Sequence, residues 1–516
     1  MSAANPLFES VVWIYTTANE LKYDDLVDLI IHAPQYYSTW WKMLLKEAPL
    51  HLVIETGLLL FIIWLLFIRR TVDPVKAAKN ERLSKKEEDW LLETWEPEPL
   101  ASTKLTKKEQ ALSSGMKVIE SVDDNYLTIR GVPGPVLNVA SFDFLGMSLE
   151  PSIKDVAKDA LDYYGCGSCG PRGFYGTIDQ HLIFEQKIAE FMGTEEAISY
   201  SDGASTVSSA IPAFSKKGDL LLVDEAVSES ILAGCNLSRS TVQFFKHNDM
   251  DDLRTILESI AADDKRLRRD AQQQRRFIVV EGLYRTTGDV CPLPQLIELK
   301  EKFFYRLILD ESLSFGAIGA TGRGVTEYFG MSIKQVEIAL LAMDTALASV
   351  GGVCIGNRDI VDHQRLSGAG YCFSASAPPF LSATAVKALA LMEAEPQRLE
   401  VLHANARAMH AMLSQLKGLQ LKTSNIITPV FHLQLCPRAD SLQEEELLIM
   451  KLAEVCVMNG VGATACKFAL APKSKYPGAN CGRPSLTLNA STKLTSKEIA
   501  KIGIVIANAL RVVMEQ

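Results

Sequence analysis

Residues 342–356 read AMDTALASVGGVCIG, and they decide how the rest of the chain is interpreted. The run indicates the end of an apolar strand, a turn of small residues, a Gly-Gly pair and a second apolar strand. Earlier in the chain, LILDESLSFG (307–316) ends another apolar strand in an acidic pair. Polar residues at the ends of neighbouring strands are typical of a ligand site in an open α/β sheet. The turn offers Thr345 and Ser349, but it contains no lysine.

Outward from this stretch, short apolar runs that end in acidic or glycine turns alternate with helical patterns. The runs are YLTIRGV, VLNVASFDFLG, EEAISYSDG, GDLLLVDEA, STVQFFKHND, RRFIVVEGLY, YRLILDESLSFG and QVEIALLAMDT. This alternation predicts an α/β fold with a mostly parallel central sheet and helices on both faces, over residues 115–380. A smaller α+β domain is expected over 381–516, where helical patterns precede the runs TPVFHLQL and PSLTLNAS.

Length and composition narrow the class of protein. A chain of 516 residues is too long for one compact core, so more than one domain is expected. The formal net charge is −9 and no basic stripe is interleaved with aromatic residues, which argues against a nucleic-acid binder. The 10 cysteines are too sparse for a disulfide scaffold, and single cysteines in apolar runs are typical of a reducing environment.

One segment predicts a membrane anchor. Residues 50–70, LHLVIETGLLLFIIWLLFIRR, contain an apolar stretch close to the length that a bilayer span requires. A buried globular helix is the alternative, but the run is apolar on every face from Leu58 to Ile68. Lysines and arginines follow it densely, so the positive-inside rule places the C-terminal bulk in the cytosol. Residues 1–49 would then be a lumenal, interfacial segment and residues 71–114 a charged cytosolic connector.

A glycine-rich stretch, YYGCGSCGPRGFYGTIDQHLIFE (163–185), indicates backbone that closely approaches a ligand or another subunit. Its Cys166 and Cys169 form a C-x-x-C pair. No second cysteine pair and no histidine pair lies near it in the sequence, so packing at an interface is preferred over a metal site.

Two histidines and one charged segment have structural interpretations beside functional ones. His181 is either catalytic or a helix-starting histidine that is hydrogen-bonded to a neighbouring loop. His247 is interpreted as part of a helix-capping environment, with Asn248 or Asp249 at the N-cap. Residues 262–276, ADDKRLRRDAQQQRR, are expected to form a solvated helix rather than a ligand site.

Several motifs, taken together and in this order, resemble the α-oxoamine synthase family of pyridoxal-phosphate (PLP) enzymes. The motifs are ASFDFLG, GCGSCGPRGFYGT, VEGLYRTTGDVCPLPQL, LILDESLSFGAIGATGRG, SVGGVCIG and GYCFSASAPP. The resemblance implies the fold-type I PLP-transferase architecture, which is also that of aminotransferases. It further implies an acyltransferase reaction that condenses an amino acid with a long-chain acyl-CoA and releases carbon dioxide.

The resemblance also explains the missing amine. In catalytic members the turn before the Gly-Gly pair carries the lysine that holds PLP as a Schiff base. That place falls on Thr345, which cannot form an imine. The places of two histidines that contact the cofactor fall on Ser228 and Leu313, and that of the arginine for the substrate carboxylate falls on Thr487. Only Asp310, the usual partner of the pyridine nitrogen, is retained, so the chain is expected to carry no catalytic residue of its own.

A partner that does the chemistry is the next implication of the resemblance. A lysine-bearing sister subunit would bind PLP covalently and form a heterodimer with this chain, and no metal is expected. The glycine-rich stretch would cover the shared active site, with Tyr164, Cys169, Arg172 and Tyr175 nearest to it. There Arg172 could pair with a phosphate or a carboxylate. The anchor would make a single pass through the endoplasmic reticulum membrane and bind small regulatory membrane proteins.

Two other functions stay open at this point. The chain could be a self-sufficient acyltransferase that uses another nucleophile or a lysine elsewhere. It could also be a membrane scaffold or sensor that takes no part in the active site. In that case, substitutions at Cys169 or Arg172 would leave the kinetics of the partner unchanged while the assembly survives.

Overall fold

A computed structural model describes residue 42 and residues 56–66, 84–97, 116–269, 273–466 and 482–515. Apart from residue 42, the predicted lumenal segment lies outside the described residues, as do residues 50–55 and 67–70 of the predicted span and most of the connector. The chain divides into two compact units, Met1–Lys104 and Leu105–Gln516.

The described part of the first unit is helical. Residues 56–66 form a helix whose residues are all exposed. Helix α5 (Lys85–Thr94) begins after Ser84, whose side chain forms a reciprocal capping box with Glu87. Within the described ranges, no helix is both long and apolar enough to cross a bilayer.

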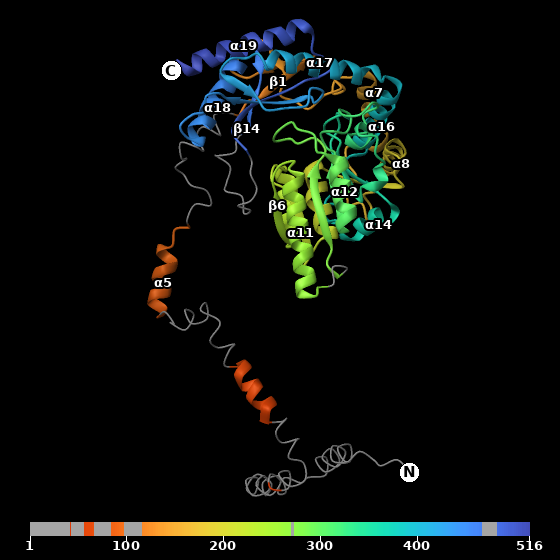
Figure 1. Ribbon diagram of the computed structural model, residues 1–516, viewed down its shortest axis with the longest axis vertical. Helices are drawn as coiled ribbons and strands as arrows, with labels where there is room; N and C mark the ends of the chain where they lie inside the picture. Colours follow the sequence, from red (N-terminus) through yellow and green to blue (C-terminus); the bar gives the residue numbers. More distant parts are fainter. Residues whose placement is uncertain are drawn as a thin grey trace. The chain divides into compact units, whose positions relative to one another are not determined.

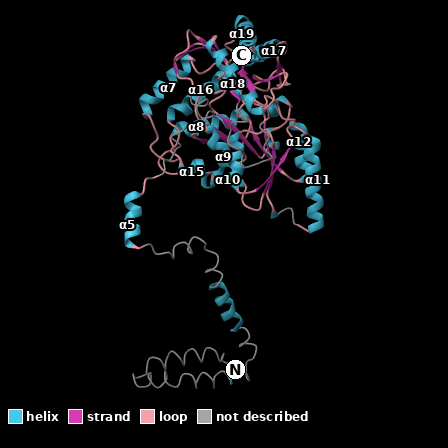
Figure 2. Ribbon diagram, turned by 90° about the vertical axis from the view of Figure 1, so that its left-hand side faces the viewer, coloured by secondary structure: helices cyan, strands magenta, loops and turns pink. Residues whose placement is uncertain are grey.

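The second unit is built around a 7-stranded sheet with the strand order β4-β10-β9-β8-β7-β5-β6 (Figure 1 and Figure 2). The strands are β4 (Glu196–Tyr200), β5 (Leu220–Asp224), β6 (Thr241–Phe245), β7 (Arg276–Glu281), β8 (Arg306–Asp310), β9 (Ile338–Ala342) and β10 (Gly352–Gly356). Neighbours pair in parallel except β10, which is antiparallel to both β4 and β9. Strands β5, β7 and β9 are buried along their whole length, as expected for a sheet covered on both faces. The predicted α/β fold with a mostly parallel sheet is confirmed.

Helices connect and cover these strands. They are α7 (Pro151–Tyr164), α8 (Asp179–Met192), α9 (Gly203–Phe214), α10 (Glu229–Ser238), α11 (Met250–Leu267), α12 (Leu293–Phe303), α13 (Val325–Tyr328), the 3-10 helix η3 (Ile333–Gln335), α14 (Arg358–Ser367), α15 (Ala369–Phe373), α16 (Pro379–Ala394) and α17 (Gln397–Leu413). Helix α9 packs against α10, and α16 packs against α7 and α8.

Two smaller sheets complete the unit. One joins β1 (Ile119–Asp123), β2 (Tyr126–Ile129), β3 (Val136–Asn138) and β13 (Val461–Gly462), in that order. The other has the order β11 (Leu419–Leu421), β12 (Val430–Leu435), β15 (Ser485–Asn489) and β14 (Thr464–Cys466). Helices α18 (Leu442–Met458) and α19 (Ser496–Met514) pack against each other at the end of the unit away from α11 (Figure 1). The runs TPVFHLQL and PSLTLNAS are confirmed as strands, and they pair antiparallel as β12 and β15.

The charged segment 262–276 is only partly a solvated helix. Helix α11 begins after Asp249, whose side chain accepts hydrogen bonds from two backbone N–H groups, so the predicted N-cap is confirmed. Near its other end, Asp264 is buried and pairs with Arg276 at 2.6 Å. The expectation of solvation is wrong for these two residues, because Arg276 already belongs to β7 and the ion pair ties the helix to the sheet.

The Gly-Gly turn between β9 and β10 lies against the first turn of α9. Gly351 has φ +137°, which favours glycine. A Cβ on Gly352 would lie 2.3 Å from Thr206 Oγ1 and 2.9 Å from Gly203 Cα, both in α9. Only glycine permits this approach, and it brings the end of β9 beside the N-terminus of α9.

Candidate functional site

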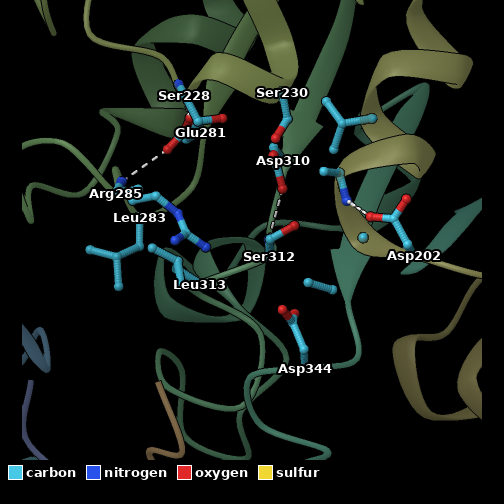
Figure 3. Close-up of a pocket in the computed structure, with 14 residues that line it drawn as sticks. Asp202, Ser228, Ser230, Glu281, Leu283, Arg285, Asp310, Ser312, Leu313 and Asp344 are labelled. Atoms are coloured by element: carbon cyan, nitrogen blue, oxygen red, sulfur yellow. Dashed lines mark hydrogen bonds between the residues drawn. The ribbon is translucent and has the colours of Figure 1, made fainter. Parts of the chain in front are cut away.

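A cavity of about 150 Å³ opens where β4, β5, β7, β8 and β9 end (Figure 3). These strands run in the same direction, so their carboxyl ends meet at one edge of the sheet, where ligands bind in open α/β folds. The cavity is lined by Asp202, Gly203, Ala204, Val207, Ser228, Ser230, Glu281, Leu283, Arg285, Asp310, Ser312, Leu313, Ala342 and Asp344. Of the positions predicted from the sequence, Ser228, Asp310 and Leu313 are brought together here.

Thr345, at the place of the expected lysine, adjoins this cavity but is buried behind it. The side chain is 1% exposed, and its hydroxyl donates a hydrogen bond of 2.9 Å to the carbonyl oxygen of Ser312. Thr345 thus ties the turn after β9 to the turn after β8. Its only polar side-chain atom is already used in holding the fold.

The two positions expected to carry cofactor-contacting histidines offer little to a ligand. Leu313 is 3% exposed and has no polar side-chain atom. Ser228 is the N-cap residue of α10, but its side chain makes no capping hydrogen bond. Its backbone N–H donates to the carboxylate of Glu281 instead.

Glu281 and Asp310 form a pair of buried carboxylates at the ends of β7 and β8. Burial, together with the charge of Asp310, raises the pKa of Glu281 to about 7. Burial also raises the pKa of Asp310, although hydrogen bonds from Ser312 oppose the shift. The backbone N–H of Ser312 lies 2.9 Å from Asp310 Oδ1, so this carboxylate holds the turn after β8.

Asp202 occupies the N-terminus of α9, which faces the cavity. Its carboxylate accepts hydrogen bonds from the backbone N–H groups of Ala204 at 2.9 Å and Ser205 at 3.1 Å. Such N–H groups at a helix start are a ready site for a phosphate. Here an internal carboxylate of the same chain has taken them.

These side chains do not fit PLP, the cofactor that the sequence resemblance implies. Thr345 cannot bind it covalently, and Leu313 cannot hydrogen-bond to it. The backbone N–H groups at the start of α9, which could hold a phosphate, already bond to the carboxylate of Asp202, whose negative charge would oppose a second anion there. Of the cofactor-contacting positions named from the sequence, only Asp310 keeps the expected residue type.

Sequence reasoning did not single out Asp202, Glu281 or Arg285 as lining the site. Asp202 carried a local signal, because an aspartate between a strand and a helix is a typical N-cap. Glu281 ends an apolar strand as Asp310 does, so the same rule applied to it. Nothing local marks Arg285, whose place in the cavity depends on the loop after β7.

The glycine-rich stretch ends α7, forms the loop 165–178 and begins α8, and it presents aromatic side chains to solvent. Tyr175 is 94% exposed, and Phe174 and Tyr163 are also largely exposed. Tyr164 is half-buried, and its hydroxyl donates a hydrogen bond of 2.9 Å to Asp179. Cys169 is an exposed free thiol with a φ of 57°.

Arg172 points inward from this loop. It is 6% exposed, and its guanidinium contacts the carboxylate of Glu185 at 2.8 and 3.1 Å. The same guanidinium donates a hydrogen bond of 2.8 Å to Ser199, at the sheet. Arg172 does pair with a carboxylate, but that carboxylate belongs to its own chain, so the residue supports the loop from inside.

Two histidines near these elements, His181 and His247, have structural roles. The ring of His181 accepts a hydrogen bond from the N–H of Ile178 and contacts the carbonyl oxygen of Ala377 at 2.8 Å, which confirms the loop-bonded interpretation. Burial lowers the pKa of His247, but hydrogen bonds to Asp224 and Asp289 outweigh this and raise it to about 9.

Thr487, at the place of the substrate-binding arginine, is buried in β15. Its side chain lies 3.5 Å from His432, whose ring also contacts the carbonyl oxygen of Arg285 at 3.0 Å. Burial lowers the pKa of His432 to about 4, so the ring is neutral at physiological pH. At the position expected to carry the substrate-binding arginine, Thr487 therefore packs within the sheet.

Comparison with protein families and with individual proteins gives a consistent result. The model of the family "Aminotransferase class I and II" matches residues 134–471. "Serine palmitoyltransferase 1" of Dictyostelium discoideum is 39% identical over 93% of this chain and 97% of its own length. "Long chain base biosynthesis protein 1" of Arabidopsis thaliana is 41% identical over 83% of this chain and 85% of its own length.

Solved structures agree with the sequence comparison. A serine palmitoyltransferase from S. paucimobilis with a bound PLP–myriocin aldimine superposes with a TM-score of 0.70 and is 25% identical, covering 80% of this chain and 97% of that one. The serine palmitoyltransferase of Sphingomonas wittichii has a TM-score of 0.69 at 24% identity, covering 79% of this chain and 96% of that one. The fold-type I architecture predicted from the sequence is thereby confirmed.

Proposed function

The chain belongs to the aminotransferase class I and II family and, within it, to the serine palmitoyltransferase subunit 1 proteins of sphingolipid biosynthesis, and from this premise we propose that it is a non-catalytic subunit. The complex would condense L-serine with palmitoyl-CoA to 3-ketosphinganine, with release of carbon dioxide and CoA. Subunit 2 of the heterodimer would carry the lysine and bind PLP covalently. The present chain would stabilise that subunit and cover its site.

The observation that carries this proposal is the environment of Thr345. The lysine position holds a hydroxyl that is buried and bonded to Ser312, and the nearby anion site is filled by Asp202. A chain that had merely exchanged one residue would keep the rest of the cofactor site. Here several independent contacts are missing, which supports a division of labour between two subunits.

The glycine-rich loop is the surface that we assign to the partner. Its large exposed aromatic residues, among them Tyr175 at 94% exposure, favour an interaction site. Cys169 lies on the same loop, and Tyr164 ends α7 just before it. Arg172 would act indirectly in this interface, because its pairing with Glu185 fixes the loop from beneath.

Localisation follows from the sequence of the first unit. We assign residues 50–70 as a single pass through the endoplasmic reticulum membrane, with the second unit in the cytosol, on the hydropathy and the flanking positive charge. Small regulatory membrane subunits would bind near this anchor. A lipid substrate and a hydrophobic product would then remain close to the bilayer.

Co-expression with subunit 2 tests the proposal. We expect the pair to co-purify from detergent and to turn over L-serine and palmitoyl-CoA, whereas this chain alone should be inactive. Tyr175→Ala should lower kcat/KM or weaken assembly several-fold, because a large exposed side chain at an interface is a typical energetic anchor. Phe304→Ala is the matched control, since Phe304 is 91% exposed and lies at the end of α12, on another element.

Turnover by the isolated chain would contradict the proposal and favour a self-sufficient acyltransferase. Normal assembly and normal kinetics with Tyr175→Ala, Cys169→Ala and Arg172→Lys would favour the membrane scaffold or sensor that takes no part in the active site. The two outcomes are distinguished by whether the activity requires subunit 2.

A further inference from the structure

The cavity at the carboxyl ends of the strands does not fit PLP, but it is large enough for a smaller ligand. The polar groups that line it indicate which ligand it can bind. Two sets of backbone donors face it. Asp202 has taken the N–H groups of Ala204 and Ser205, and Glu281 has taken that of Ser228. At the start of α9 an anionic ligand would find these donors occupied, and at α10 the N–H of the N-cap residue Ser228 is held by Glu281.

The cavity is lined by more acidic than basic side chains. Asp202, Glu281, Asp310 and Asp344 contribute four carboxyl groups, against the single guanidinium of Arg285. In Figure 3, Arg285 approaches from one side, and Asp310 and Asp344 from the other. A cation placed between these carboxylates would relieve their mutual repulsion.

Asp310 has acceptor capacity to spare. The residue is 6% exposed and lines the cavity; its hydrogen bonds come from Ser312, and the charge of Arg285 acts with them to lower its pKa against the effect of burial. A carboxylate has about four lone-pair sites. Leaving a nearly buried charged group incompletely bonded is costly, so a donor from a ligand would be stabilising here.

Arg285 offers donors that the described residues do not use. Its guanidinium carbon lies 4.5 Å from the centre of the Phe142 ring, a cation–π contact that holds the head group in place. Within the described ranges, the guanidinium makes neither a hydrogen bond nor an ion pair. Five N–H donors in a planar fork are suited to a carboxylate.

We propose that this cavity binds a small ligand through a primary ammonium group. The ammonium donates hydrogen bonds to Asp310, with Asp344 beside it, and Arg285 donates hydrogen bonds to an acid group where the ligand has one. The cavity volume of about 150 Å³ is several times the roughly 10–15 Å³ that one water molecule needs, so it admits a ligand of a few heavy atoms. The site lies wholly within this chain, so it goes beyond the proposed role in the heterodimer and does not depend on it.

The test is a set of titrations of the purified full chain in detergent, followed by calorimetry at one fixed pH. Glycine carries both groups, ethylamine only the ammonium, acetate only the acid, and inorganic phosphate serves as the anion. We expect glycine and ethylamine to bind, glycine more tightly, and acetate and phosphate not to bind. Binding of both amines with equal affinity would identify a simple amine site, and a preference for glycine an amino-acid site.

Variants assign the contacts. Asp310→Asn should weaken both amines by roughly 10- to 100-fold, the usual effect of removing a charged hydrogen-bond partner. Arg285→Gln should reduce the affinity for glycine to that for ethylamine and leave ethylamine bound. Asp251→Asn and Arg254→Gln, which remove an exposed ion pair on α11, are the matched controls.

Asp344→Asn keeps the test decisive if Asp310→Asn does not fold, because Asp344 is exposed and its replacement leaves the sheet intact. It should weaken both amines several-fold. The proposal is overturned if neither amine binds, if acetate or phosphate binds as tightly as glycine, or if the Asp310 and Asp344 variants bind both amines unchanged. A failed heterodimer assay would not bear on it, since the titrations use this chain alone.

Discussion

At the scale of single residues, the position proposed for the cofactor lysine has a structural role. The hydroxyl of Thr345 donates a hydrogen bond to the carbonyl oxygen of Ser312. Asp202 fills the adjacent helix N-terminus. Both polar groups are thus bonded within the chain.

Restoring the lysine should not restore the cofactor. Thr345→Lys would break the hydrogen bond to Ser312 and force a longer side chain into a position that is 1% exposed, and such overpacking costs about 1–3 kcal/mol. We expect a lower Tm and no absorbance band of bound PLP in the isolated chain. Thr345→Ser, which keeps the hydroxyl, is the control and should retain near-normal stability. Bound cofactor in the spectrum of the lysine variant would refute this expectation.

The buried carboxylates predict how stability depends on pH. The pKa of Glu281 rises from its ordinary value of 4.5 to about 7 in the folded chain. The folded state therefore binds more protons than the unfolded state between these two values, and stability falls as the pH rises through this range. The same holds for Glu311, where burial also raises the pKa to about 7.

Glu281→Gln tests this dependence. The amide cannot ionise, so the decrease in Tm between about pH 5 and pH 7.5 should become shallower than in the unmodified chain. Thermal unfolding across this pH range is the measurement. Glu298→Gln, at an exposed position on α12, is the control and should leave the slope unchanged. An equal slope in the Glu281 variant would mean that this carboxyl group does not titrate there.

At the scale of elements, the glycine-rich loop is held by a segment far away in the sequence. The backbone N–H and the hydroxyl of Ser376 both donate to the carbonyl oxygen of Gly170, and Ser168 donates to the carbonyl oxygen of Ser376. A Cβ on Gly176 would lie 1.9 Å from that same Gly170 oxygen. The loop closes on itself only because this position has no side chain.

Gly176→Ala should therefore open the loop, whereas Gly173→Ala should not. A Cβ at Gly173 meets no atom within 4 Å, and its backbone has no positive φ, so it is a matched control in the same loop. Hydrogen exchange over residues 163–177 should increase in the Gly176 variant, and binding to subunit 2 should weaken. If both variants behave alike, the close contact does not order the loop.

At the scale of the whole molecule, the two units carry different parts of the proposed function. The second unit contains the three sheets and all of the described hydrophobic core. The first unit contains the apolar run that the sequence assigns to the membrane. Folding and membrane attachment should therefore be separable.

Removal of residues 1–104 tests this separation. The remaining chain should keep a cooperative unfolding transition, because its core is complete, and it should move from the membrane fraction to the supernatant. Sedimentation after cell lysis and thermal unfolding are the measurements. A chain that lacks only residues 1–49 is the control and should stay with the membrane. If the chain that lacks residues 1–104 still associated with the membrane, the anchor would lie outside those residues.

Much of this protein was determined by sequence alone. Local patterns predicted the strands from β4 to β10 and the cap of α11, and they showed Thr345 where a lysine was expected. Periodicity, caps and reactive side chains can be read from neighbouring residues. Only the tertiary structure decided that Asp202, Glu281 and Arg285 line one cavity, and that Arg172 pairs with Glu185 of the same chain. Such contacts join segments that meet only once parallel strands align their carboxyl ends and helices cover the sheet, and no pattern within a single segment records them.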